Sequence, residues 1–357
     1  MGGVIITASH NPIQYNGIKL LLGNGMAPPY EAAEQIKRYF SSKRFALAGS
    51  PDCGQVICNE QTDVTHIGKV LAIVDKEVIA AKKFRVVLDS VNGAGGMVTK
   101  GMLAELGCEV IAINDQPTGL FAHTPEPTAK NLTGLCEVVK KQQCEVGFAQ
   151  DPDADRLAIV DENGVYLGEE YTLALATKYI LGKQNGKVAT NLSTSRMIDD
   201  IASKANCQVI RTAVGEANVA EAMLEHNCVI GGEGNGGVID LRVGPIRDSL
   251  VGIAFVLQLM AETGKTISQL ASEIGSYYMI KDKFAADKSQ AQQILKKVKK
   301  TFINAKVDTT DGCRFDFADG WVHIRPSNTE PVVRVIAEAK DKQTVQKYID
   351  VLLDLAR

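Results

Sequence analysis

Short apolar runs that end in turn residues alternate with helical patterns over residues 84–231 of this 357-residue chain. Brief β-branched runs are typical of buried strands, whereas apolar residues repeated every three or four positions indicate helices. Strands that alternate with helices predict parallel sheets covered by helices, and the pattern restarts at residue 169, which predicts two such units. The predicted strands are 84–88, 109–113, 145–149, 187–192, 208–211 and 228–231, and the predicted helices are 97–106, 133–143, 169–181, 196–205 and 216–226.

The two ends of the chain carry different patterns. The first strand pattern, at residues 4–7, opens the chain with no earlier element to pair with. Near the C-terminus, two strand patterns flank Asp319-Gly320, and an Asp-Gly turn favours an antiparallel hairpin, so we expect a small α+β domain there. The other predicted elements are helices at 30–40 and from about 63 to 78, strands at 314–317, 321–324 and 332–338, and a closing helix at 342–355.

Composition excludes several classes of protein. Lysine and arginine total 39 and aspartate and glutamate 42, a net charge of −3 that argues against a nucleic-acid groove or an anionic membrane surface. The longest apolar stretch, 251–260, is interrupted by Gln258 and is too short to span a membrane. Eight cysteines occur without any Cys-x-x-Cys pair, and the first residues lack the pattern of a secretory signal. We therefore expect a cytoplasmic protein with reduced thiols.

A polar segment, Thr7-Ala8-Ser9-His10-Asn11-Pro12, directly follows the first strand pattern. A serine beside a histidine is a candidate nucleophile with its base. The Gly-x-Ser-x-Gly elbow is absent, however, and a histidine adjacent in sequence rarely has the geometry of a catalytic triad. A polar turn that ends at proline is an equally good interpretation of this segment alone.

A second polar segment, Asp151-Pro152-Asp153-Ala154-Asp155-Arg156, follows the strand predicted at 145–149. Three carboxylates at alternate positions offer hard oxygen ligands for Mg²⁺ or Ca²⁺. An EF-hand is excluded, because Arg156 stands at the sixth loop position, where glycine is required. A solvated acidic turn is the alternative, but three unpaired carboxylates repel one another, so a cation site is favoured.

Two further loops carry groups that could bind a ligand. In Gly231-Gly232-Glu233-Gly234-Asn235-Gly236-Gly237, the glycines permit close backbone approach, and Glu233 and Asn235 could hydrogen-bond to hydroxyls; a flexible linker is the alternative. Arg325-Pro326-Ser327-Asn328-Thr329-Glu330-Pro331 combines a guanidinium with hydroxyl and amide donors, which suits a phosphate; a polar turn between prolines is the alternative.

Taken together and in this order, the four segments resemble those of the α-D-phosphohexomutase family, and the resemblance covers the whole chain. It implies tandem three-layer α/β/α domains followed by a C-terminal α+β domain with an antiparallel sheet. The implied divisions are 1–75 with the phosphoserine loop, 76–166 with the metal loop, 167–280 with the sugar loop and 281–357 with the phosphate loop. The implied reaction is the interconversion of 1-phospho and 6-phospho hexoses.

The resemblance also implies roles for individual residues. Ser9 would carry the phosphoryl group and, with Asp151, Asp153 and Asp155, would bind one Mg²⁺. Arg156 would lie beside them, and Lys19 would be a proton-transfer group. A bisphosphorylated hexose would act as activator, and the protein would be a monomer or homodimer. The substrate-binding residues would be His10, Glu216, Glu233, Asn235, Arg325, Ser327, Asn328 and Thr329.

Two departures from the family pattern shape further expectations. Family members normally have a complete first α/β domain, whereas this chain begins at its phosphoserine strand, so we expect a truncated first domain. We also expect a disordered, displaced or partner-paired segment over residues 1 to about 60, and low or absent mutase activity. A non-catalytic sugar-phosphate-binding protein is the alternative function, and a leaky phosphatase a third. In addition, Glu216 and the Glu-Gly-Asn-Gly-Gly loop resemble phosphoglucosamine mutases and favour an amino-sugar phosphate over mannose phosphate.

Overall fold

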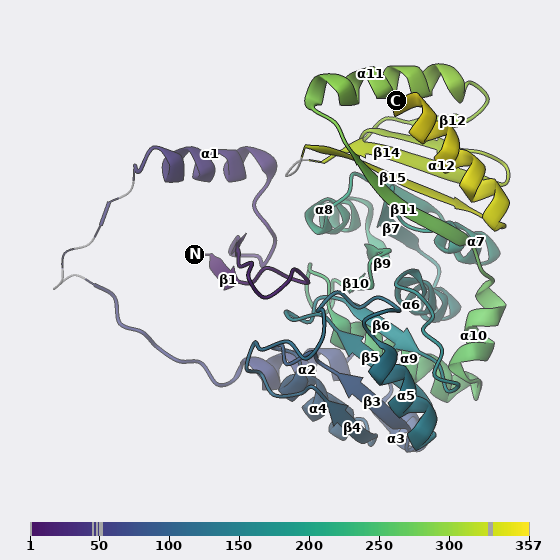
Figure 1. Ribbon diagram of the computed structural model, residues 1–357. Helices are drawn as coiled ribbons and strands as arrows, with labels where there is room; N and C mark the ends of the chain where they lie inside the picture. Colours follow the sequence, from purple (N-terminus) through teal and green to yellow (C-terminus); the bar gives the residue numbers. More distant parts are fainter. Residues whose placement is uncertain (1, 45, 48, 50–52, 328–330, 357) are drawn as a thin grey trace.

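The structure, a computed structural model, describes residues 2–44, 46–47, 49, 53–327 and 331–356. Over these residues the chain forms four sheets, three of which are covered by helices (Figure 1). The three larger sheets follow one another from the bottom to the top of Figure 1 in chain order, and the N-terminal hairpin lies beside the middle one. The predicted combination of α/β units with a C-terminal antiparallel sheet is confirmed.

The first large sheet has the strand order β4-β3-β5-β6. Successive residues of each strand face opposite sides of the sheet. Val86 and Leu88 therefore pack with helices α2 (Thr62–Leu71), α3 (Lys76–Ala80), α4 and α9 (Ser249–Thr263), whereas Val87 packs with Leu135 and Val139 of α5. The elements are β3 (Arg85–Asp89), α4 (Gly96–Glu105), β4 (Glu109–Ile113), α5 (Thr133–Gln142), β5 (Val146–Gln150) and β6 (Leu157–Val160).

The second large sheet has the order β10-β9-β7-β8 and repeats this arrangement. Val188 and Ile230 face helices α6, α7 and α9, whereas Ala189 packs against Val219 and Met223 of α8. The elements are α6 (Glu170–Lys183), β7 (Lys187–Asn191), α7 (Met197–Lys204), β8 (Val209–Thr212), α8 (Glu216–His226), β9 (Cys228–Glu233), β10 (Gly237–Ile239), α9 (Ser249–Thr263) and α10 (Ile267–Ile274).

Helix α9 joins the two α/β units into one core. Its residues from Ser249 to Ala261 are all buried, because the helix packs on α6 and β10 of one unit and on α2, α3 and β6 of the other. A helix that is apolar on every side is stable in water only when it is enclosed in this way. Its one internal amide, Gln258, accepts a hydrogen bond from the backbone N–H of Asp75 and donates one to Glu262.

The last sheet is antiparallel throughout, with the order β11-β15-β14-β13-β12. One face packs on α11 and α12, and the other carries Arg314, Trp321 and His323, which are buried against the second α/β unit. The predicted boundary at residue 280 falls inside β11. The elements are β11 (Tyr278–Ala285), α11 (Lys288–Thr301), β12 (Lys306–Asp308), β13 (Cys313–Asp316), β14 (Gly320–Pro326), β15 (Val332–Ala339) and α12 (Lys342–Ala356).

The N-terminal segment differs most from expectation. The first strand, β1 (Gly3–Ile6), pairs antiparallel with β2 (Ile18–Leu21), a partner that the sequence pattern does not reveal. Helix α1 (Tyr30–Ser41) stands apart from the three large sheets in Figure 1. The prediction of a single helix from about 63 to 78 is wrong, because this stretch forms two helices, α2 (Thr62–Leu71) and α3 (Lys76–Ala80). The break between them ends at Asp75, whose side chain caps α3 by accepting from the N–H of Val78.

Two edge strands that the sequence patterns do not predict are antiparallel to their neighbours in otherwise parallel sheets. β6 pairs antiparallel with β5, and β10 pairs antiparallel with β9. The connections are residues 151–156 and 234–236, and a parallel neighbour would need a crossover of about a dozen residues or more. These two tight connections are the aspartate-rich segment and the glycine-rich segment, so each is held at both ends by a sheet.

The contact between α2 and α9 gives a pH-dependent prediction. His66 Nε2 lies 2.6 Å from Asp248 Oδ2, and Asp248 also caps α9 by accepting from the N–H groups of Leu250 and Val251. The hydrogen bond to Asp248 raises the pKa of His66 above its ordinary 6.5, although burial opposes this. The stabilisation is therefore fully present below pH 6.5 and is lost as the pH rises through the raised pKa.

We expect His66→Gln to lower the free energy of unfolding by up to about 1 kcal/mol more at pH 6 than at pH 9, since the pair is partly exposed and screened. Chemical denaturation of both proteins at the two pH values measures this difference. An equal loss at pH 6 and pH 9 would show that the histidine contributes packing rather than charge.

Two other features concern the cysteines and the apolar helices. All eight cysteines lie in the described part of the chain, and all are free thiols. Among the described residues, no single helix has the length and apolar composition to cross a membrane. The helices α9 and α10, which are bent by 95° relative to each other, have that length and composition only when they are taken together.

Candidate active site

Three carboxylates gather in the tight connection between β5 and β6. Asp151, Asp153 and Asp155 each direct one oxygen into a space in which the three oxygens lie within 4.8 Å of one another. Asp151 is fully buried, and Oδ1 of both Asp153 and Asp155 is buried without a hydrogen-bond partner. Buried carboxylate oxygens without donors are costly unless a cation or a proton compensates them. The donor set therefore fits a hard divalent cation such as Mg²⁺.

The serine segment faces this cluster. It follows β1, and Ser9 has a left-handed backbone with φ = 52° that turns its hydroxyl toward the aspartates. Ser9 Oγ donates to Asp151 Oδ2 at 3.2 Å and lies 3.2 Å from His10 Nδ1, while Thr7 Oγ1 donates to Asp153 at 3.3 Å. The sequence predicts a segment displaced from the body of the protein. The serine segment lies instead against the three carboxylates.

Two cations also reach the carboxylates. Lys19, which β2 places opposite Ile5, has its Nζ 2.7 Å from Asp153 and 3.2 Å from Asp155. Arg156 Nε lies 3.8 Å from both Asp151 and Asp155, and the backbone N–H of Arg156 donates to Asp151. The structure thus brings the predicted reacting group, the predicted metal ligands and both predicted cations into one cluster.

The charges in this cluster shift one another's pKa values in opposite directions. Burial and the charges of Asp155 and Asp153 raise the pKa of Asp151 well above its usual range. Burial also opposes ionisation of Asp155, but Arg247, Lys19 and Arg156 hold its pKa below the usual range. The Lys19 ammonium loses hydration on burial, yet Asp155 and Asp153 raise its pKa, so it remains protonated. Asp151 is therefore the least compensated carboxylate when no cation is bound.

The glycine-rich segment is a packed turn and not a flexible linker. Glu233 ends β9 and accepts from Asn191 Nδ2 at 2.7 Å and from the Gly215 N–H at 3.0 Å. Asn235 Nδ2 donates to the same carboxylate at 3.3 Å. A Cβ atom on Gly234 would lie 2.0 Å from a buried glutamate oxygen, and one on Gly236 would lie 2.4 Å from a carbonyl oxygen. Glycine is needed at both positions because the backbone approaches its neighbours so closely.

The predicted phosphate loop is linked through Asp311 to the segment just before α8. Arg325, in β14, lies 3.4 Å from Asp311 Oδ2, and this oxygen also accepts from the N–H of Val214. Arg325 Nε is buried without a hydrogen-bond partner among the described residues. Ser327 follows the strand, and its N–H donates to the carbonyl of Val332. Asn328 and Thr329, the other two predicted phosphate ligands, lie outside the described residues.

Sequence reasoning missed the residue that links these groups. Arg247, which directly precedes the N-cap of α9, donates to Asp155 at 2.6 Å, to Glu233 at 2.8 Å and to Glu216 at 2.9 Å. Glu216 begins α8, and burial raises its pKa despite the charge of Arg247. The only signal in the sequence is an arginine between a Gly-Pro turn and a helix-capping aspartate.

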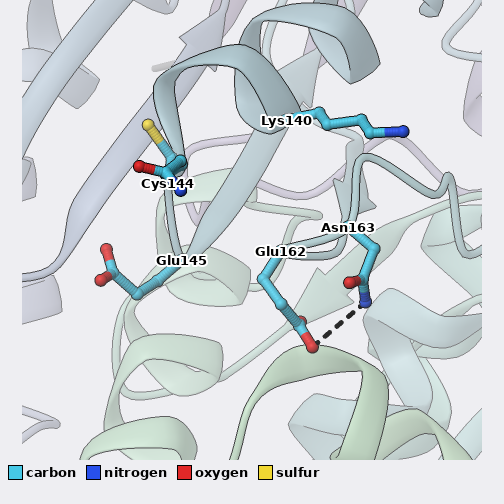
Figure 2. A pocket seen from close by; sticks show the side chains of 6 residues that line it. Lys140, Cys144, Glu145, Glu162 and Asn163 are labelled. Atoms are coloured by element: carbon cyan, nitrogen blue, oxygen red, sulfur yellow. Dashed lines mark hydrogen bonds between the residues drawn. The ribbon is translucent and has the colours of Figure 1, made fainter.

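A surface depression of about 440 Å³ lies elsewhere and has a different character. Figure 2 shows Glu162 hydrogen-bonded to Asn163, with Lys140, Cys144 and Glu145 around them. This depression lies at the amino end of β5, because Glu145 precedes that strand, whereas the three aspartates follow its carboxyl end. Ligands of open α/β sheets bind at carboxyl ends, so the aspartate cluster is the candidate active site.

The fold and this cluster define a class of protein, the phosphohexomutases. Matches to known families agree: four models of the phosphoglucomutase/phosphomannomutase family match in order, those of α/β/α domain I at residues 1–47, domain II at 64–164, domain III at 168–277 and the C-terminal domain at 280–355. The chain belongs to this family, whose members are isomerases that transfer a phosphoryl group within a hexose phosphate.

Two relatives match almost the whole chain. A phosphoglucomutase/phosphomannomutase of Thermococcus kodakarensis is 40% identical, and the match covers 99% of this chain and 78% of the relative. A "Probable phosphoglucosamine mutase" of Methanopyrus kandleri is 35% identical, with coverage of 99% and 78%. The domain I model matches residues 1–47, and this match does not support the expectation of a truncated first domain.

Two solved structures have the same fold. A phosphoglucomutase/phosphomannomutase family protein of Burkholderia thailandensis superposes with a TM-score of 0.84 at 22% identity, over 99% of this chain and 76% of that one. An N-acetylphosphoglucosamine mutase of Aspergillus fumigatus, in complex with GlcNAc-6P and magnesium, gives a TM-score of 0.68 at 16% identity, over 100% and 88%.

Proposed function

We propose that this chain interconverts 1-phospho and 6-phospho hexoses through a phosphoserine at Ser9, with Mg²⁺ held by Asp151, Asp153 and Asp155. The observation that carries the proposal is the hydrogen bond between Ser9 Oγ and Asp151 Oδ2 at the mouth of the carboxylate cluster. A divalent cation bound there would neutralise charge on a phosphoryl group being transferred.

In the proposed first half-reaction, the bond from phosphorus to Ser9 Oγ breaks while a bond forms from phosphorus to the free hydroxyl of the sugar. The proton lost by this hydroxyl ends on Ser9 Oγ. Burial and the charge of Arg156 lower the pKa of His10, so its imidazole is neutral at pH 7, and with Nδ1 3.2 Å from Ser9 Oγ it is placed to carry this proton. Lys19, for which the resemblance implies proton transfer, is held protonated by Asp155 and Asp153, and we propose that it acts instead as a cation toward the phosphoryl oxygens.

The second half-reaction requires the bisphosphorylated intermediate to turn end over end. Arg325, with Ser327, Asn328 and Thr329, would hold whichever phosphate is not reacting, and Glu233 and Asn235 would bind sugar hydroxyls. A single phosphate cradle then serves both ends of the hexose. A free bisphosphorylated hexose would recharge Ser9 after loss of its phosphate, which is why we expect it to activate the enzyme.

For the substrate, we propose glucosamine phosphate ahead of mannose or glucose phosphate. Glu216 supports this choice, because a carboxylate beside the sugar loop favours a hexose that carries an amino group at pH 7. The relative named "Probable phosphoglucosamine mutase" agrees with this choice, whereas the 40% identical relative is named for glucose and mannose phosphates, so all three substrates are compared in the assay.

A coupled assay tests the proposed function. The purified chain is supplied with the 6-phosphates of glucosamine, mannose and glucose in turn, with Mg²⁺ and a bisphosphorylated hexose, and formation of each 1-phosphate is measured. We expect isomerisation that depends on Mg²⁺ and stops on chelation. Binding of a hexose phosphate by calorimetry without turnover would indicate a binding protein instead, and release of inorganic phosphate without isomerisation would indicate a phosphatase.

A further inference from the structure

One guanidinium group connects the metal loop, the sugar loop and the start of α8. Each nitrogen of Arg247 has a different carboxylate partner: NH2 donates to Asp155, NH1 to Glu233 and Nε to Glu216. The backbone N–H of Arg247 donates to Glu216 as well, at 3.2 Å. The fork geometry of arginine allows such a three-way contact, which the single ammonium group of lysine does not reproduce.

The path of this side chain is fixed by packing. Arg247 is about 10% exposed, and a Cβ atom on Gly237 would lie 2.1 Å from its Cδ, so the aliphatic part runs directly over the glycine backbone. On its other side, Asp248 anchors the chain by capping α9. The guanidinium therefore has little freedom to move toward one partner without withdrawing from another.

Two partners of Arg247, Asp155 and Glu233, belong to different loops of the candidate site. Asp155 Oδ1 is buried without a hydrogen-bond partner, 3.8 Å from Arg156 Nε, while Oδ2 accepts from Arg247 and Lys19. Glu233 receives four hydrogen bonds, from Asn191, Gly215, Asn235 and Arg247. Any change in the charge on Asp155 therefore alters how strongly Arg247 is attracted to Glu233, and the reverse is also true.

We propose that Arg247 is a positioning residue that couples cation binding at Asp155 to the sugar-loop carboxylate Glu233. A cation at the three aspartates draws the charge of Asp155 to itself, so Arg247 is held more by Glu233 and Glu216. Conversely, loss of the Glu233 charge leaves Arg247 to compete with the cation for Asp155. This inference rests on the proposed function, because it assumes that Asp151, Asp153 and Asp155 bind Mg²⁺.

A double-mutant cycle on Mg²⁺ affinity tests the coupling without any substrate. Isothermal titration with MgCl₂ gives the dissociation constant for the wild type, Glu233→Gln, Arg247→Met and the double variant. We expect Glu233→Gln to weaken Mg²⁺ binding by about threefold or more in the wild-type background, which is within the range of coupling between contacting residues. In the Arg247→Met background, Glu233→Gln should change the logarithm of the Mg²⁺ dissociation constant by less than about half of its change in the wild-type background.

Two further variants keep the test independent of folding defects. Arg247→Lys retains the charge but not the fork, so the coupling should be lost in this background too, with thermal unfolding close to that of the wild type. Arg242→Lys is the matched control: this arginine lies five residues earlier and pairs with Asp240, away from the three aspartates, so the effect of Glu233→Gln should be unchanged.

Each result decides the question. Equal effects of Glu233→Gln in the wild-type and both Arg247 backgrounds would overturn the coupling while leaving the Mg²⁺ site intact. A wild-type chain that binds no Mg²⁺ at all would overturn the proposed function, and the inference with it, and this outcome is recognisable from the first titration.

Discussion

Replacing Ser9 by alanine is expected to reduce mutase activity by at least about four orders of magnitude, since loss of an attacking group typically removes most of an enzyme's rate enhancement. No other hydroxyl donates to Asp151 among the described residues, so nothing replaces the lost oxygen. The fold should survive, because Ser9 lies in a partly exposed loop and belongs to no apolar core. Intact-mass measurement should show a phosphate on the wild type that is absent from the variant.

The control for this experiment is Ser268→Ala. The Ser268 hydroxyl, on α10, donates to Glu162 and lies apart from the aspartates. We expect this variant to keep both its activity and its phosphate. A phosphate that remains on the Ser9→Ala chain would contradict the assignment of Ser9 as the phosphorylated residue, even if activity were lost.

Asp151→Asn should abolish mutase activity without lowering the stability of the metal-free protein. The amide keeps the shape of the side chain but removes a charged ligand, so we expect Mg²⁺ affinity to fall by about 100-fold or more and mutase activity to be lost. The metal-free protein should be equally or more resistant to unfolding, by about 1 kcal/mol, because the charge removed is fully buried and is repelled by Asp153 and Asp155.

Calorimetry with MgCl₂ and thermal unfolding in chelator measure the two effects. Asp161→Asn is the matched control, since Asp161 is also buried in the same unit but its carboxylate accepts from the N–H groups of Asn163 and Val165. This control should not alter Mg²⁺ affinity. An Asp151→Asn protein that binds Mg²⁺ as tightly as the wild type, or that unfolds much more readily in chelator, would show that the carboxylate has a structural role.

The parts of the fold that the sequence predicts well are those with the greatest burial. The inner residues of β3 and β5, 86–88 and 146–149, are buried on both faces and are apolar, and α5 buries Leu135 and Val139 on one side. β2 is different: it has four residues, mostly half-exposed, and its pairing with β1 depends on the chain reversal at residues 7–17. β6 and β10 are not among the strands predicted from the sequence, because each is only three or four residues long and directly follows a polar or glycine-rich turn.

The candidate site follows a similar division. Ser9 and the three aspartates stand out because reactive or like-charged side chains cluster within a few residues, and the structure brings the two clusters together. Arg247 lies 92 residues from Asp155 along the chain and 14 from Glu233, so its importance arises only when three separate loops meet. Its position between a Gly-Pro turn and a helix-capping aspartate indicates a loop before a helix but does not indicate a contact with Asp155 or Glu233.

The short antiparallel connections also restrict how chain length can vary. A residue inserted between β5 and β6 would shift their pairing by one position and turn the core face of β6, with Leu157 and Ile159, toward the opposite side of the sheet. An insertion between β9 and β10 would separate Glu233 from the backbone that holds Arg247. We expect length changes to be tolerated instead in exposed segments without helix or strand, such as residues 53–60, whereas the two turns are fixed in length by the paired strands that they connect.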